Sequence, residues 1–112
     1  MTGEERQFLL TSAWLFMHHG RRYCARGVCE ALCEANPHDG VAASALAELL
    51  LEDGEAARAL EILRLADFAP ELAHAQAVLE TRALRMAGRP LEAESRWRRY
   101  LESRKGAERK WV

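Results

Sequence analysis

The sequence contains no uninterrupted apolar run approaching the ~20 residues that a membrane-spanning helix requires. Its start, Met1 to Arg6, lacks the basic and apolar regions of a secretory signal peptide. The formal net charge is −1, so the chain as a whole creates no strong field that would attract nucleic acid or an anionic membrane. We therefore expect a protein that works in the cytoplasm, without membrane insertion and without a nucleic-acid partner.

Cysteine is scarce, and the three residues present are clustered at Cys24, Cys29 and Cys33. An odd number in one short stretch does not suit a disulfide framework and is typical of a reducing compartment. Three thiolates together with His38 could in principle hold zinc in a tetrahedral site. Structural zinc sites favour short C-x-x-C turns, however, whereas these cysteines fall at packing positions of one helix. We expect small buried side chains, with no metal and no cofactor.

Recognisable catalytic motifs are also absent from the sequence. It contains no H-E-x-x-H, no G-x-S-x-G, no phosphate loop and no G-x-G-x-x-G. None of its four histidines has a carboxylate or a nucleophile at a diagnostic spacing. The two neighbours His18 and His19 stand at the expected end of a helix, where the helix dipole favours a positive charge. The sequence therefore predicts a protein that is not an enzyme.

What the chain does contain is an internal repeat of glycine and alanine. Gly20, Gly54 and Gly88 are spaced 34 residues apart, and each is followed five residues later by an alanine, at positions 25, 59 and 93. A period of this length is typical of the tetratricopeptide repeat, a pair of antiparallel helices joined by a tight turn. We expect the glycines in the turns, where a positive φ costs them little, and the alanines where two helices cross.

This spacing predicts an all-α fold in which three tetratricopeptide-like helix hairpins stack in a right-handed superhelix with a concave groove. We expect a single domain over residues 1–105, with repeats at about 4–37, 38–70 and 71–105, followed by a basic tail over 106–112. Asp39 is a suitable N-cap for the second repeat, and Pro37 closes the first. The last helix is expected to end near Arg104, with no capping helix after it.

The expected first helix is apolar on more than one face. Phe8, Leu9, Leu15 and Phe16 alternate at helical spacing with a second apolar set, Leu10, Trp14 and Met17. A helix of this kind must be covered on two sides. The uncapped last helix likewise keeps apolar residues (Trp97, Tyr100 and Leu101) that something else has to cover.

In this repeat, fixed positions of the first helix of each pair point into the concave groove. Counting each turn glycine as position fifteen, we take positions two, five, nine, twelve and thirteen. The first repeat then contributes Gln7, Leu10, Trp14, Met17 and His18; the second Val41, Ser44, Glu48, Leu51 and Glu52; and the third Ala75, Val78, Arg82, Arg85 and Met86. The result is an apolar patch beside an acidic pair and a basic pair, which indicates a site for an apolar peptide helix. The alternative is that some of these side chains fold back into the core.

The C-terminal stretch is rich in cations: Arg96, Arg98, Arg99, Arg104, Lys105, Arg109 and Lys110. Such a stretch could contact phosphates or an acidic protein surface. The alternative is a solvated helix face with cations favoured near a helix C-terminus. Nucleic-acid-binding proteins usually interleave such charges with exposed aromatics, whereas Trp97 and Tyr100 fit packing positions here. We favour the solvated face.

Beyond the repeat pattern, the opening segment Arg6-Gln7-Phe8-Leu9-Leu10, followed by Trp14-Leu15, is not required by a generic repeat. Together with Leu32, Asn36-Pro37 and the closing Tyr100-Leu101-Glu102, it resembles the small SctY (YscY) chaperones of bacterial type III secretion. The resemblance spans nearly the whole chain at matching length. The cysteine cluster and the basic tail are not features of that family's pattern.

The resemblance implies a bacterial cytoplasmic chaperone, not an enzyme, that is recruited to the secretion apparatus. Its partner would be a small SctX-like export substrate bound as a heterodimer, and the pair would engage the cytosolic domain of the export gate SctV. Related chaperones with the same repeat serve needle or translocator subunits, and a generic adaptor for protein–protein interaction is a further alternative. The resemblance fixes neither the client's identity nor the stoichiometry nor any self-association of the free protein.

Overall fold

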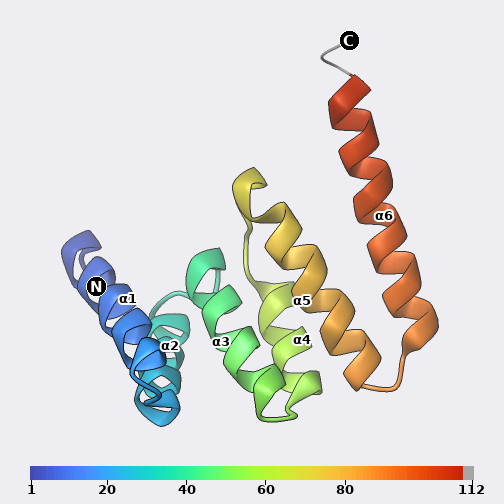
Figure 1. Ribbon diagram of the computed structural model, residues 1–112. Coiled ribbons are helices and arrows are strands. Elements are labelled where there is room, and N and C mark those ends of the chain that lie inside the picture. The colour runs from blue at the N-terminus through green and yellow to red at the C-terminus, as the bar shows by residue number, and fades with distance from the viewer. Residues whose placement is uncertain (110–112) are drawn as a thin grey trace.

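A computed structural model describes residues 1–109, and this part of the chain folds into α-helices joined by short turns. The order is α1 (Gly3–His18), α2 (Arg22–Ala35), α3 (Gly40–Glu52), α4 (Ala56–Leu65), a 3₁₀ turn η1 (Pro70–Leu72), α5 (Ala73–Met86) and α6 (Pro90–Arg109). Consecutive helices pack in pairs, α1 with α2, α3 with α4 and α5 with α6. Figure 1 shows the pairs arranged in a row from the N-terminus to α6. The all-α prediction is confirmed.

The three turn glycines behave as the spacing predicts. Gly20, Gly54 and Gly88 have φ angles of 71°, 79° and 77°, in the left-handed region that side chains with a Cβ avoid. Each lies directly between the helices of one pair. The alanines five residues later, at positions 25, 59 and 93, are completely buried. The repeat in the sequence is therefore a repeat in local conformation and in helix packing.

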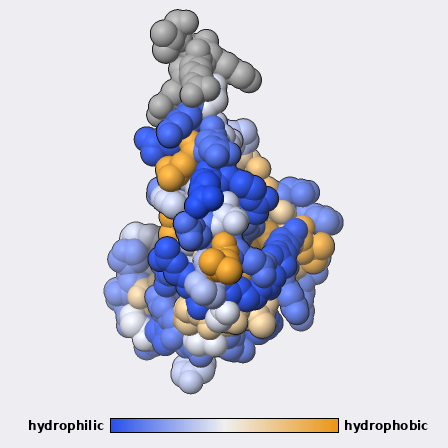
Figure 2. Space-filling model, turned by 90° about the vertical axis from the view of Figure 1, so that its right-hand side faces the viewer, coloured by the Kyte–Doolittle hydropathy of each residue, from blue (hydrophilic) through white to orange (hydrophobic). Residues whose placement is uncertain are grey.

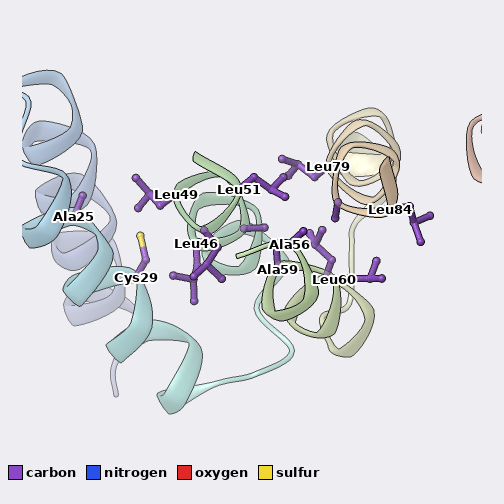
Figure 3. Close-up of a cluster of buried hydrophobic side chains, with 14 of the residues drawn as sticks. Ala25, Cys29, Leu46, Leu49, Leu51, Ala56, Ala59, Leu60, Leu79 and Leu84 are labelled. Atoms are coloured by element: carbon purple, nitrogen blue, oxygen red, sulfur yellow. The ribbon is translucent and has the colours of Figure 1, made fainter. Parts of the chain in front are cut away.

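The core lies between neighbouring helices along the row, with α3 at its centre. This helix packs against α2, α4 and α5, and it contributes more buried side chains than any other described helix. In Figure 3, Leu49 lies on the side of α3 that faces Ala25 and Cys29 of α2, whereas Leu51 extends toward Leu79 of α5. Because neighbours cover α3 on three sides, its apolar side chains are buried around most of the helix, apart from the face that carries Ser44, Glu48 and Glu52.

Ion pairs join the first helix pair to the second. Arg22 of α2 contacts Glu52 at 3.1 Å and Asp53 at 2.6 Å, at the end of α3. Arg26 reaches Asp53 at 2.8 Å and Glu55 at 2.5 Å. These partly exposed pairs contribute little energy one by one, but several charges in one network fix the relative position of the two helix pairs. Within the third pair, by contrast, Arg96 of α6 contacts the buried Glu80 of α5, so this ion pair joins the two helices of one pair.

Two boundaries differ from those expected. The third unit opens with the 3₁₀ turn at Pro70, so the regular helix begins at Ala73 instead of near Glu71. At the C-terminal end, α6 continues to Arg109 instead of ending near Arg104. Lys105, Ala107 and the residues around them have good helix propensity, which outweighs the single Gly106. Residues 106–109 of the expected tail are thus helical, and residues 110–112 lie outside the described residues.

Gly40 marks the place where the connection before α3 meets the connection after α4. The backbone N–H of Asp67 donates to the carbonyl of His38 at 3.0 Å, and a Cβ on Gly40 would lie 2.5 Å from the carbonyl oxygen of Asp67. We expect Gly40→Ala to lower the free energy of unfolding by about 1–3 kcal/mol, because backbone has to move to admit the methyl group.

Gly27 is the matched control for this substitution, because it lies within α2 and a Cβ there would meet nothing within 4 Å. Gly27→Ala should raise the free energy of unfolding by about 0.5–1 kcal/mol through helix propensity. Urea denaturation of both variants measures the difference. Equal effects of the two substitutions would show that the two connections do not meet at Gly40.

Candidate protein-binding groove

A first shallow hollow lies where α1 passes α3. Its lining consists of Arg6, Gln7, Leu10, Thr11, Trp14 and Val41, four of which were predicted as groove residues from the repeat. Trp14 is the largest of them and remains 56% exposed. Its ring lies on that of His18, with the two centroids 3.8 Å apart. A large aromatic held in place by a neighbour yet open to solvent is suited to contact an apolar partner.

The two helices beside this hollow are joined by an ion pair. The guanidinium of Arg6 donates to both carboxylate oxygens of Asp39, at 2.6 Å and 3.1 Å. Asp39 is also the N-cap of α3 and accepts from the backbone N–H groups of Val41 and Ala42, as the sequence predicted. The hydrogen bond from Arg6, and then those two amides, hold the pKa of the Asp39 carboxyl below its usual range. The bidentate pair therefore sets how α1 lies against α3.

A second hollow lies between α3 and α5. It is lined by Ser44, Ala45, Glu48, His74, Ala75, Val78, Leu79 and Arg82. Five of the predicted groove residues are among them: Ser44, Glu48, Ala75, Val78 and Arg82. The exposed carboxylate of Glu48 comes from α3 and the exposed guanidinium of Arg82 from α5. This hollow thus combines an apolar floor with charges of opposite sign.

His74 is a residue of this hollow that the repeat positions did not predict. Its Nδ1 lies 3.3 Å from the hydroxyl of Tyr100, and its ring meets those of Trp97 and Tyr100 edge-on. The aromatic pair on α6 thus reaches the start of α5 through His74. The signal in the sequence was the expected packing role of Trp97 and Tyr100, but nothing there indicated His74 as their neighbour.

Leu51 was predicted in the groove, and that prediction is wrong. The side chain is 2% exposed and belongs to the main core cluster. The contact between α3 and α5 covers it, as its direction toward Leu79 in Figure 3 shows. The fixed repeat position assumes that successive first helices diverge enough to expose this side chain, whereas here the two helices are in direct contact.

The remaining predicted residues lie outside both hollows. Met17 is partly buried against the core cluster, so its side chain lies between the two alternatives, a groove position and a core position. Glu52 is exposed, but its carboxylate is engaged by Arg22. Arg85 and Met86 are exposed at the end of α5, and His18 is exposed beside Trp14. The structure therefore places nine of the fifteen predicted groove residues in two hollows along α1, α3 and α5.

The cysteines do not share one environment. Cys29 is buried in the core and Cys33 is partly buried, as expected for packing positions, whereas Cys24 is exposed. Burial raises the pKa of both the Cys29 and the Cys33 thiols to about 11. Both are therefore protonated at neutral pH, and a protonated thiol is a poor metal ligand and a poor nucleophile. Within the part of the chain that the structure describes, no group of three potential metal ligands comes together.

Part of the basic C-terminal stretch is engaged within the helix pair to which it belongs. Arg96 contacts Glu80, and Arg98 contacts Glu94 at 2.8 Å. Arg99 lies in a hollow between α4 and α6. The exposed Arg98–Glu94 pair is of the kind expected for a solvated helix face, the alternative favoured from the sequence, whereas the Arg96–Glu80 pair is largely buried between α5 and α6.

No family model matches the chain, and no curated protein matches it significantly. Among the described residues, no helix combines the length and the apolar character needed to cross a bilayer.

Proposed function

We propose that the chain is a tetratricopeptide-type chaperone of bacterial type III secretion, similar to SctY, that covers an apolar helical segment of a small SctX-like export substrate. The observation that carries the proposal is the pair of hollows along α1, α3 and α5, which contain most of the residues that the repeat assigns to a groove. The N-terminal Arg6-to-Leu10 segment and the other residues that resemble SctY supply the specific family.

In this proposal the three helix pairs are three tetratricopeptide repeats stacked in a right-handed superhelix. The positive φ of each turn glycine and the complete burial of each following alanine support the assignment. The first helices of the pairs then face the concave side. That geometry accounts for hollows that lie between α1 and α3 and between α3 and α5.

The hollows suit an amphipathic helix as the bound segment. Leu10 and Trp14 would receive one apolar anchor of the partner, and Val78 in the second hollow would receive another. Glu48 and Arg82 lie beside this floor and would select partner charges, giving the orientation. An export substrate that must stay incompletely folded exposes such apolar faces and aggregates alone, so a preformed groove protects it.

The same assignment implies how the client reaches the export apparatus. The chaperone would work in the bacterial cytoplasm and be recruited with its client to the cytosolic domain of the export gate SctV. In this account the chain itself carries out no chemistry.

The experiment is co-expression with each small protein encoded beside it in a secretion operon, followed by size-exclusion chromatography with mass detection. We expect a stable one-to-one complex with an SctX-like protein, which would be insoluble when expressed alone. A complex with a needle or translocator subunit would instead assign the chain to the related chaperones. Failure to retain any export substrate, while an unrelated protein binds, would leave a general interaction adaptor.

A further inference from the structure

The side of α1 that faces away from α2 is apolar. Phe8 and Leu15 lie seven residues apart, on the same face of the helix, and are 69% and 45% exposed. A hollow lined by Glu4, Glu5, Phe8 and Leu9 lies at the start of this face. We call this surface, with Phe8 and Leu15 at its centre and Ser12 between them, the outer face of α1. It differs from the groove, because Phe8 and Trp14 are separated by about a third of a turn around the helix.

The internal repeat identifies the residues of the second helix pair that are equivalent to this face. A shift of 34 residues takes Phe8 to Ala42 and Leu15 to Leu49, both on α3. Those two residues are 0% and 1% exposed. Leu49 lies on the side of α3 that packs against α2, the helix before it in the row (Figure 3). The outer face of α1 is therefore the face that a preceding helix covers elsewhere in the fold.

The other end of the row places charged groups beside its exposed apolar residues, Leu91 and Leu101. At the position on α6 equivalent to the buried Leu60 of α4 stands Glu94, which is exposed and pairs with Arg98. Figure 2, which looks onto this end, shows a predominantly hydrophilic surface with separate hydrophobic patches. Head-to-tail stacking of copies would bring the Glu94–Arg98 pair to the edge of the contact with α1 and would desolvate part of both charges.

The outer face is instead complementary to itself in an antiparallel arrangement. If two copies of α1 cross about a two-fold axis between residues 11 and 12, Phe8 of each meets Leu15 of the other. The small side chains of Thr11 and Ser12 then lie at the axis and permit close approach. The acidic first turn, Glu4 and Glu5, meets the partner helix's end, where His19 and then Arg21 follow. The opposed helix dipoles favour the same orientation.

We propose that the occupant of the outer face is a second copy of this chain, and that the protein is a two-fold symmetric dimer through antiparallel α1 helices. The interface is isologous, so it closes at two copies. It leaves Trp14 and the groove open, and a client bound to each copy would give an assembly of two chaperones and two clients. The inference does not depend on the client's identity, since it concerns the free protein.

Size-exclusion chromatography with mass detection over a concentration series tests the dimer. The wild-type chain should have twice the monomer mass of 12.6 kDa, and Phe8→Glu should reduce it to the monomer. Leu91→Glu is the matched control, because Leu91 is an equally exposed apolar residue on α6, and this variant should stay dimeric. A wild-type monomer up to the solubility limit, or growth beyond two copies, overturns the proposal.

Oxidative cross-linking tests the orientation. In a Cys24→Ser background, a single added Ser12→Cys should form a disulfide between two chains, because residue 12 lies next to the axis. Glu4→Cys should not, since the two copies of residue 4 would be about 22 Å apart along the helices at 1.5 Å per residue. The Cys24→Ser parent must remain uncross-linked. Cross-linking at position 4 but not at position 12 would overturn the antiparallel arrangement.

The two surfaces can be separated in one set of variants. Phe8→Glu should abolish the dimer while keeping the one-to-one ratio of chaperone to client. The contrary result is a free chain that is monomeric and a client that covers Phe8 when it binds the wild type. It would show that the outer face binds the client and would overturn the second copy as its occupant.

Discussion

Replacing Leu51 by alanine is expected to lower the free energy of unfolding by about 2–5 kcal/mol, the usual cost of deleting most of a buried leucine side chain. Leu51 is 2% exposed and is enclosed by the contact between α3 and α5. The cavity left behind would be shared by these helices, which are held at that spacing by the rest of the core. Urea denaturation followed by circular dichroism measures the loss.

The matched control is Val41→Ala, because Val41 lies on the same helix, was predicted in the same groove and is 43% exposed, against 2% for Leu51. It should cost well under 1 kcal/mol. The folded fraction of Leu51→Ala should bind the client with unchanged affinity, since this side chain does not reach the hollows. Weakened binding with unchanged stability would instead restore Leu51 to the groove and refute the packing of α3 on α5.

Trp14→Ala is expected to weaken client binding and to leave stability nearly unchanged. The binding free energy should fall by about 2 kcal/mol or more, roughly 30-fold in affinity. Trp14 presents the largest apolar surface of the first hollow, and aromatic anchors of this kind dominate binding energies. Because more than half of the side chain is already in water, the stability of the free protein should change little. Isothermal titration with the purified client measures the affinity.

Phe8→Ala serves as the control for this variant, since it removes an even more exposed aromatic residue from the same helix but from its outer face. It should leave client affinity near the wild-type value. If Phe8→Ala weakened the complex and Trp14→Ala did not, the client would bind the outer face of α1, and the proposed groove would have to be abandoned.

Local features of this fold were predictable because they depend on few residues. A glycine with positive φ between two helices, and an alanine where helices cross, follow from backbone sterics and side-chain size, and both repeat along the chain. The N-cap role of Asp39 is equally local. Its ion pair with Arg6 was not predictable, because it joins residues 33 positions apart across two helix pairs.

The positions of apolar side chains were harder to predict than their helices. Leu49, Leu50 and Leu51 are consecutive and all buried, because α3 has neighbours on three sides. The helix α1 also carries apolar residues on more than one face, but it lies at the end of the row, so Phe8 and Leu15 remain exposed. Sequence indicates that such a helix needs cover, whereas only the arrangement of helices shows which face lacks it.

The central claim is that the client occupies the concave side of α1, α3 and α5. The most direct measurement is ¹⁹F NMR of the chain labelled with 5-fluorotryptophan, in which single Trp→Phe substitutions assign the three signals. Addition of unlabelled client should shift and broaden the Trp14 signal, because this ring lies in the first hollow and is largely exposed. A complex that forms while the Trp14 signal stays unchanged would contradict the account.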